Sequence, residues 1–125
     1  MNKKELIVIK IGSNVLTDNK GKLSHKSFKR IAKQIKKFYK FDKKIIIVSS
    51  GAIACGSEKL KIDYQMRTIP QKQGAAAVGQ GLLMDYYRRY LTPIKIGQIL
   101  LTADGLKNKN RAENITNTFN ELLKM

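Results

Sequence analysis

The chain has 125 residues, of which 42% are hydrophobic, and a formal net charge of +16. This length fits one domain or part of one, and the apolar fraction is high enough for a packed core, which disfavours a disordered chain. No apolar stretch reaches the roughly 18 residues of a membrane span, and the single Cys55 cannot form a disulfide within the chain, so we expect a cytoplasmic protein.

The first half of the chain predicts a strand, a helix and a second strand. Leu6–Ile9 is a continuous apolar run, typical of a strand that is buried on both faces of a parallel sheet. After a polar, turn-rich segment, residues 24–40 carry apolar side chains at helical spacing and lysines on the opposite face, with Ser24 as N-cap. Ile45–Val48 predicts the second strand.

The second half of the chain also predicts helices and a strand in alternation. Residues 52–56 predict a short helix or turn, and residues 58–67 an exposed loop. Thr68 and Gln71 have capping-box spacing at the start of a helix that we expect to reach about Tyr90. Several glycines inside this helix favour close backbone packing over a nearby ligand as their reason. Residues 94–101 predict a third strand and residues 110–123 a last helix.

This β-α-β-α-β-α order predicts an α/β fold, with helices on both faces of a mainly parallel sheet in a three-layer αβα sandwich. Ligands of such sheets bind beyond the carboxyl ends of the strands. Two polar, glycine-containing turns fall at those ends, Lys10 to Ser13 and Ser49 to Ala52. We therefore expect both turns on one rim of the sheet, where an anion and a second substrate could meet.

The turn after the first strand favours phosphate binding, because a lysine and backbone N–H groups can face the same anion. The chain has neither a P-loop sequence nor the glycine fingerprint of dinucleotide-binding folds. With one cysteine and one histidine, His25, it offers no ordinary zinc site and no cysteine–histidine nucleophile pair. We therefore expect no protein-bound metal centre.

Taken together, four blocks resemble the glutamate 5-kinase family of the amino acid kinase superfamily, in order and in spacing. They are Ile9-Lys10-Ile11-Gly12-Ser13 through Thr17, Val48-Ser49-Ser50-Gly51-Ala52, Lys72-Gln73 through Gly81, and Gln98-Ile99-Leu100-Leu101-Thr102. The related acetylglutamate kinases carry a His-Gly-Gly-Gly turn after the second strand, where this chain has Ser49 to Ala52. The resemblance covers essentially the whole chain.

This resemblance implies that ATP phosphorylates the side-chain carboxylate of L-glutamate, in the first step of proline biosynthesis. It implies that Lys10 contacts the ATP phosphates and stabilises the transferring group, and that the Gly12 and Ser13 amides complete that cradle. Ser50, Gly51 and Ala52 would hold the glutamate, and Mg²⁺ would screen the phosphates. The resemblance also implies that full-length members of the family form homo-oligomers.

The chain ends where the family continues into its nucleotide-binding half. We therefore expect residues 1–125 to be the N-terminal, glutamate-binding portion of a kinase domain, inactive alone and poorly stable as a monomer. One alternative is a non-catalytic fragment that binds glutamate or associates with an intact subunit. A weaker alternative is a basic nucleic-acid-binding domain, which is disfavoured because aromatic side chains do not interleave with the basic face.

Overall fold

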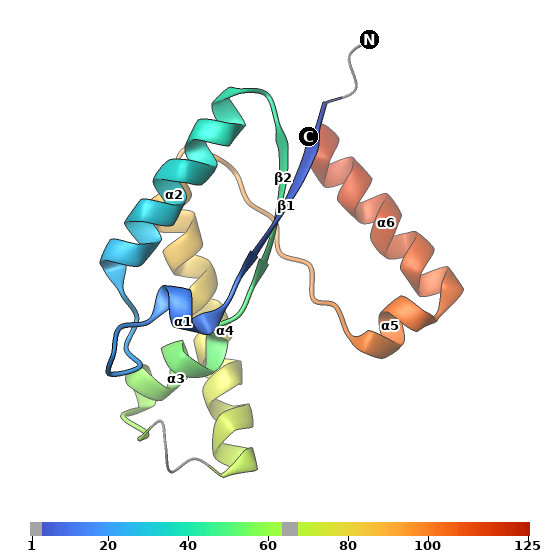
Figure 1. Cartoon of the computed structure of the whole chain (residues 1–125). Helices are drawn as coiled ribbons and strands as arrows, with labels where there is room; N and C mark the ends of the chain where they lie inside the picture. Colours follow the sequence, from blue (N-terminus) through green and yellow to red (C-terminus); the bar gives the residue numbers. More distant parts are fainter. Residues whose placement is uncertain (1–3, 64–67) are drawn as a thin grey trace. The chain divides into compact units, whose positions relative to one another are not determined.

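The computed structural model describes residues 4–63 and 68–125, and the chain divides into two compact units (Figure 1). The first unit, Met1–Lys95, contains β1 (Leu6–Ile11), α1 (Ser13–Leu16), α2 (His25–Lys40), β2 (Lys44–Ser49), α3 (Ala52–Leu60) and α4 (Ile69–Leu91). The second unit, Ile96–Met125, contains α5 (Ala103–Lys107) and α6 (Lys109–Lys124). The predicted α/β class with a parallel sheet is confirmed, as an incomplete form of the αβα fold.

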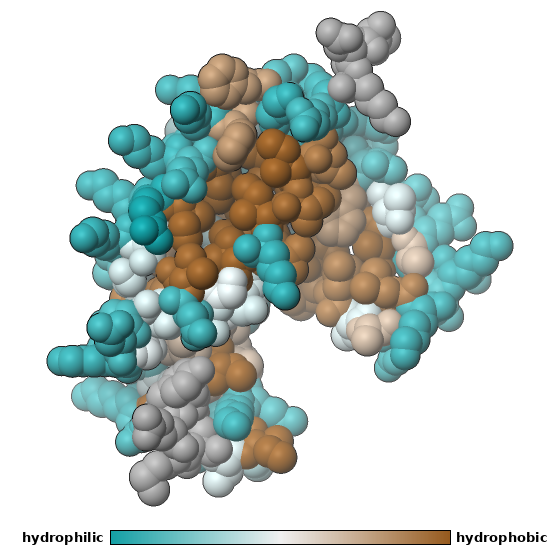
Figure 2. Space-filling model, viewed as in Figure 1, coloured by the Kyte–Doolittle hydropathy of each residue, from teal (hydrophilic) through white to brown (hydrophobic). Residues whose placement is uncertain are grey.

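β1 and β2 pair in parallel, with Ile7 opposite Ile45 and Ile9 opposite Ile47. Our expectation that the first strand is buried on both faces is wrong, because side chains alternate along β1 between exposed and covered positions. Leu6 and Val8 are 49% and 59% exposed, whereas Ile11 is 3% exposed. Figure 2 accordingly shows apolar side chains at the molecular surface. The first unit therefore covers only one face of its sheet.

The prediction of a third strand at residues 94–101 is wrong, because the structure has no strand there. The segment has no regular secondary structure and no ladder hydrogen bonds, since the described sheet consists of β1 and β2 alone. Apolar β-branched residues favour a strand, but a strand forms only where a neighbour accepts its hydrogen bonds. Within the second unit, this segment packs on α6: a Cβ added to Gly97 would lie 3.3 Å from a methyl group of Leu122.

The predicted loop at residues 58–67 begins too early, because α3 continues to Leu60. Lys61 ends the helix in the left-handed conformation, with φ of 55°. Residues 64–67 of that predicted loop lie outside the described residues.

Both long helices of the first unit begin as predicted. The Ser24 hydroxyl accepts a hydrogen bond from the Ser27 amide at 3.2 Å. The capping box of α4 is complete, because the Thr68 hydroxyl accepts from the Gln71 amide and the Gln71 side chain accepts from the Thr68 amide, at 3.3 and 2.9 Å. These bonds satisfy amides that a helix leaves without intrahelical partners.

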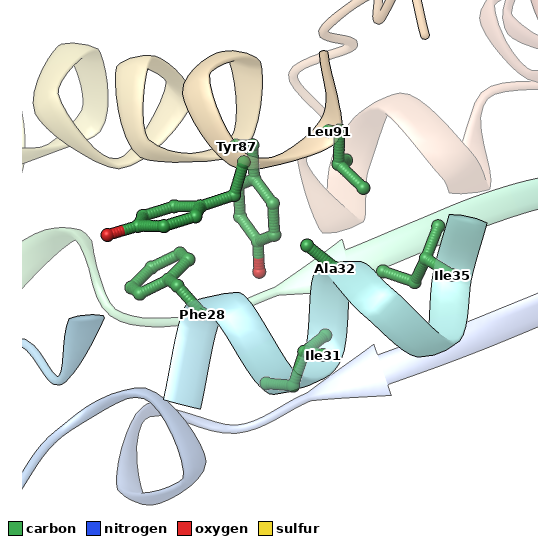
Figure 3. A pocket seen from close by; sticks show the side chains of 7 residues that line it. Phe28, Ile31, Ala32, Ile35, Tyr87 and Leu91 are labelled. Carbon is green, nitrogen blue, oxygen red and sulfur yellow. The ribbon is translucent and has the colours of Figure 1, made fainter. Parts of the chain in front are cut away.

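α2 and α4 pack through apolar and aromatic side chains (Figure 3). Phe28, Ala32 and Ile35 of α2 lie against Tyr87 and Leu91 of α4, and all five are at most 6% exposed. The small void between these helices is lined almost entirely by carbon, so it is part of the hydrophobic core and not a binding site.

α3 and α4 approach each other through glycine. A Cβ added to Gly79 would lie 1.7 Å from the Ala52 carbonyl oxygen, and one added to Gly56 would lie 1.7 Å from that of Ala75. No side chain fits at either position, so close packing explains these two glycines. Burial at this interface also raises the pKa of the Cys55 thiol to about 11.

Two glycines of α4 give a matched test of this packing. Gly79→Ala should destabilise the chain by roughly 1–3 kcal/mol or more, because overpacking forces the two backbones apart. Gly81→Ala should instead stabilise it by about 0.5–1 kcal/mol, since a Cβ there meets nothing within 4 Å and alanine favours the helix. Urea unfolding followed by circular dichroism measures both, and equal effects would contradict the packing account.

Candidate functional site

The two strand ends are joined at the carboxyl edge of the sheet. The Ser50 amide donates a hydrogen bond to the Ile11 carbonyl at 2.9 Å, one residue beyond the paired strands. Gly51 then turns the chain into α3 with φ of 115°, a left-handed conformation that L side chains rarely adopt. The turn after β2 is therefore fixed against the end of β1, as the sequence predicts for one shared rim.

A chain of hydroxyl groups holds the turn after β2 against α4. The Ser49 hydroxyl donates to the Ser50 carbonyl at 2.9 Å and lies 2.6 Å from the Tyr87 hydroxyl. Because a serine hydroxyl carries one proton, Tyr87 is the donor to Ser49. Burial raises the pKa of the Tyr87 phenol, so the phenol keeps the proton that this bond requires.

A pocket of about 360 Å³ opens beside this turn. Its wall comes from three elements: Ser13 of α1, the turn and first residues of α3, and Lys72 of α4. The residues that line it are Ser13, Ser50, Gly51, Ala52, Ile53, Ala54 and Lys72. This volume lies at the lower end of the range of small-molecule sites, about 300–1,000 Å³. Hydroxyl groups, a helix N-terminus and an ammonium group suit a small anionic ligand.

The structure brings four of the six predicted site residues to this pocket: Ser13, Ser50, Gly51 and Ala52. Gly12 precedes it as the N-cap of α1, and a Cβ added there would meet nothing within 4 Å. Lys10 does not line the pocket.

Lys10 lies near the carboxyl end of β1, where its side chain is exposed on the same face of the sheet as Leu6 and Val8. Within residues 4–63 and 68–125, no acidic side chain forms an ion pair with it. The predicted phosphate lysine is therefore accessible, at the rim of the sheet and outside the pocket wall.

Three pocket residues were not among the predicted site residues, Ile53, Ala54 and Lys72, and of these Lys72 carries the charged side chain. The sequence held one physical sign of its role: Lys72 is a cation in the first turn of a helix, where the helix dipole favours an anion. A lysine in such a position is normally a solvated surface residue. Only the fold shows that Lys72 lines the same pocket as Ser50 and Gly51.

The part of the chain that the structure describes has neither a metal-binding cluster nor a membrane-spanning helix. No three histidine, cysteine, aspartate or glutamate side chains there lie close enough together to bind a metal ion. None of the helices there has the length and apolarity that a membrane crossing requires.

Comparison with known proteins identifies the family of this chain. Residues 5–125 match the amino acid kinase family. The chain belongs to this family. The parallel pairing of β1 and β2 agrees with this family assignment.

Several relatives share this region of the amino acid kinase fold. The chain is 44% identical over 119 residues to the glutamate 5-kinase of Clostridium acetobutylicum, covering 94% of this chain and 45% of the relative. It is 40% identical to that of Dictyoglomus turgidum and 44% identical to that of Geobacter sulfurreducens, covering 98% of this chain and 34% of each relative. The chain thus spans between about a third and a half of the length of these relatives.

The hydroxyl chain that holds the site can be tested by a double-mutant cycle. Tyr87→Phe and Ser49→Ala should each destabilise the chain by about 0.5–1.5 kcal/mol, and together by less than the sum, because both remove one shared hydrogen bond. Additive losses in urea unfolding would show that the two hydroxyls do not interact.

The raised pKa of Tyr87 adds a pH dependence to the same test. The folded phenol ionises above the unfolded value of 10.0, so this contribution to stability is complete below pH 10 and is lost as the pH rises through the folded pKa. Tyr87→Phe should therefore lose less stability than the unsubstituted chain between neutral and strongly alkaline pH.

Proposed function

We propose that this chain is the glutamate-binding part of an enzyme that transfers the γ-phosphoryl group of ATP to the side-chain carboxylate of L-glutamate. The product is glutamate 5-phosphate, and the reaction begins proline biosynthesis. The observation that carries the proposal is the pocket that joins Ser13, Ser50, Gly51 and Ala52 beside the rim where Lys10 lies. The relatives' names, glutamate 5-kinase, supply the substrate.

In this reaction a carboxylate oxygen of glutamate forms a bond to the γ-phosphorus, and the bond from that phosphorus to the bridging oxygen of ADP breaks. Phosphoryl transfer depends on positioning and on neutralised charge more than on covalent chemistry. The pocket would position the glutamate, with Ser50, Gly51 and Ala52 as its contacts. Lys10 would stabilise the negative charge on the transferring group.

The residues at the rim suit the phosphates of ATP. Lys10 has an exposed ammonium group that forms no ion pair with the described side chains. Space beside Gly12 is open, so a phosphate could approach the backbone between Lys10 and Ser13. Mg²⁺, when bound with ATP, would screen the phosphate charges.

The remaining expectations form part of this proposal. Residues 1–125 would act as the N-terminal portion of a cytoplasmic, homo-oligomeric kinase and would bind glutamate alone without turning it over. The alternative is a protein that binds glutamate and has no kinase activity in any assembly. Phosphoryl transfer by a complete domain that contains these residues separates the two.

A chimera provides that complete domain. The 119 aligned residues of this chain would replace the matching 45% of the Clostridium acetobutylicum glutamate 5-kinase. The chimera should release ADP only when glutamate is present. Lys10→Ala should reduce the rate by roughly 10²–10³-fold, the usual loss when one group that stabilises transition-state charge is removed.

Lys29→Ala is the matched control, since Lys29 lies exposed on α2, and it should leave the rate unchanged. A chimera that folds but releases no ADP would refute the proposed reaction. A Lys10→Ala chimera as active as its parent would refute the role of Lys10 alone.

A further inference from the structure

We propose that Lys72 binds the α-carboxylate of glutamate, the carboxylate that does not receive the phosphoryl group, and so selects a dicarboxylic amino acid. This inference rests on the proposed function of the same pocket. It assigns to Lys72 the recognition of the end of the substrate that remains chemically unchanged.

Lys72 has a fixed backbone position beside the pocket. It follows the capping box of α4, and its amide donates to the Thr68 carbonyl at 2.9 Å, so its backbone is held within the first helical turn. From there its side chain lines the pocket that Ser50, Gly51 and Ala52 also line. A long, flexible lysine on a fixed backbone can follow a carboxylate within the pocket.

Lys72 adds a positive charge where the backbone is already positive. The first turn of a helix is the positive end of its dipole, where a cation is unfavourable and an anion is favourable. Lys72 forms no ion pair with any acidic side chain in residues 4–63 and 68–125. The N-terminal turn of α3, which begins at Ala52, adds a second positive helix end to the same pocket. An anionic group of the ligand would relieve this concentration of positive charge.

The two carboxylates of glutamate need different surroundings. A cation bound tightly to the reacting carboxylate would withdraw electron density from the oxygen that must attack phosphorus. Lys10 lies outside the pocket wall, at the rim where the phosphates are expected, and Lys72 lies in the wall. This separation places the reacting carboxylate toward Lys10 and the α-carboxylate toward Lys72.

The test uses the 125-residue chain and two ligands, L-glutamate and 4-aminobutyrate, which is glutamate without its α-carboxylate. Calorimetric titration should show at least tenfold tighter binding of L-glutamate. Lys72→Met should weaken L-glutamate to the level of 4-aminobutyrate and leave 4-aminobutyrate unchanged. Lys72→Arg keeps the charge and should retain most of the preference.

Lys26→Met is the matched control, because Lys26 is an exposed lysine in the first turn of α2 and is not in the pocket wall. It should bind both ligands as the unsubstituted chain does. Circular dichroism and urea unfolding confirm that each variant is folded before titration.

Three results would overturn the inference. If Lys72→Met binds L-glutamate as well as the unsubstituted chain does, Lys72 has no role, while the pocket stands. If Lys72→Met weakens the binding of both ligands equally, Lys72 does not recognise the α-carboxylate. If the unsubstituted chain binds neither ligand, the inference fails too, and ADP release by the chimera then shows separately whether the proposed reaction fails with it.

Discussion

The close approach of α3 and α4 is the constraint on which the rest of the first unit depends. Ala52 meets Gly79 and Gly56 meets Ala75, so the two helices contact each other antiparallel, at a distance that a single Cβ would prevent. Ala52 is at once the first residue of α3 and part of the pocket wall. The contact that closes the helix interface therefore also fixes the position of the site.

The same interface explains how distant parts of the sequence reach one pocket. α4 carries Lys72 at its beginning, Gly79 in its middle and Tyr87 near its end. Gly79 fixes α3, Tyr87 bonds to Ser49 at the end of β2, and Lys72 lines the pocket. One helix thus holds the turn after β2 through a hydrogen bond and supplies a charged group to the pocket beside that turn.

The sequence predicts best what local chemistry decides. The caps at Ser24 and Thr68 satisfy helix amides with nearby atoms, and the structure confirms both. The apolar run at residues 94–101 has strand composition, but pairing requires a neighbour that no local pattern specifies. The prediction that the first strand is buried fails for the same reason. Val8 is apolar but 59% exposed, because its burial depends on which elements cover the sheet.

The residues of the site likewise include some that local sequence predicts and others that it does not. The turn from Ser50 to Ala52 could be predicted, because a glycine after a strand marks a turn and strand ends bind ligands. Lys72 could not be placed there, since its proximity to Ser50 arises from the packing of α4 on α3 and leaves no pattern in neighbouring residues.

Amide mapping by NMR tests most directly whether this pocket binds glutamate. The ¹⁵N-labelled chain is titrated with L-glutamate, and amide shifts are followed by NMR at every assigned residue. We expect saturable shifts at Ser13, at Ser50 to Ala54 and at Lys72, with the exposed basic face of α2 unchanged. Shifts confined to that basic face, or no saturable shifts, would contradict the account.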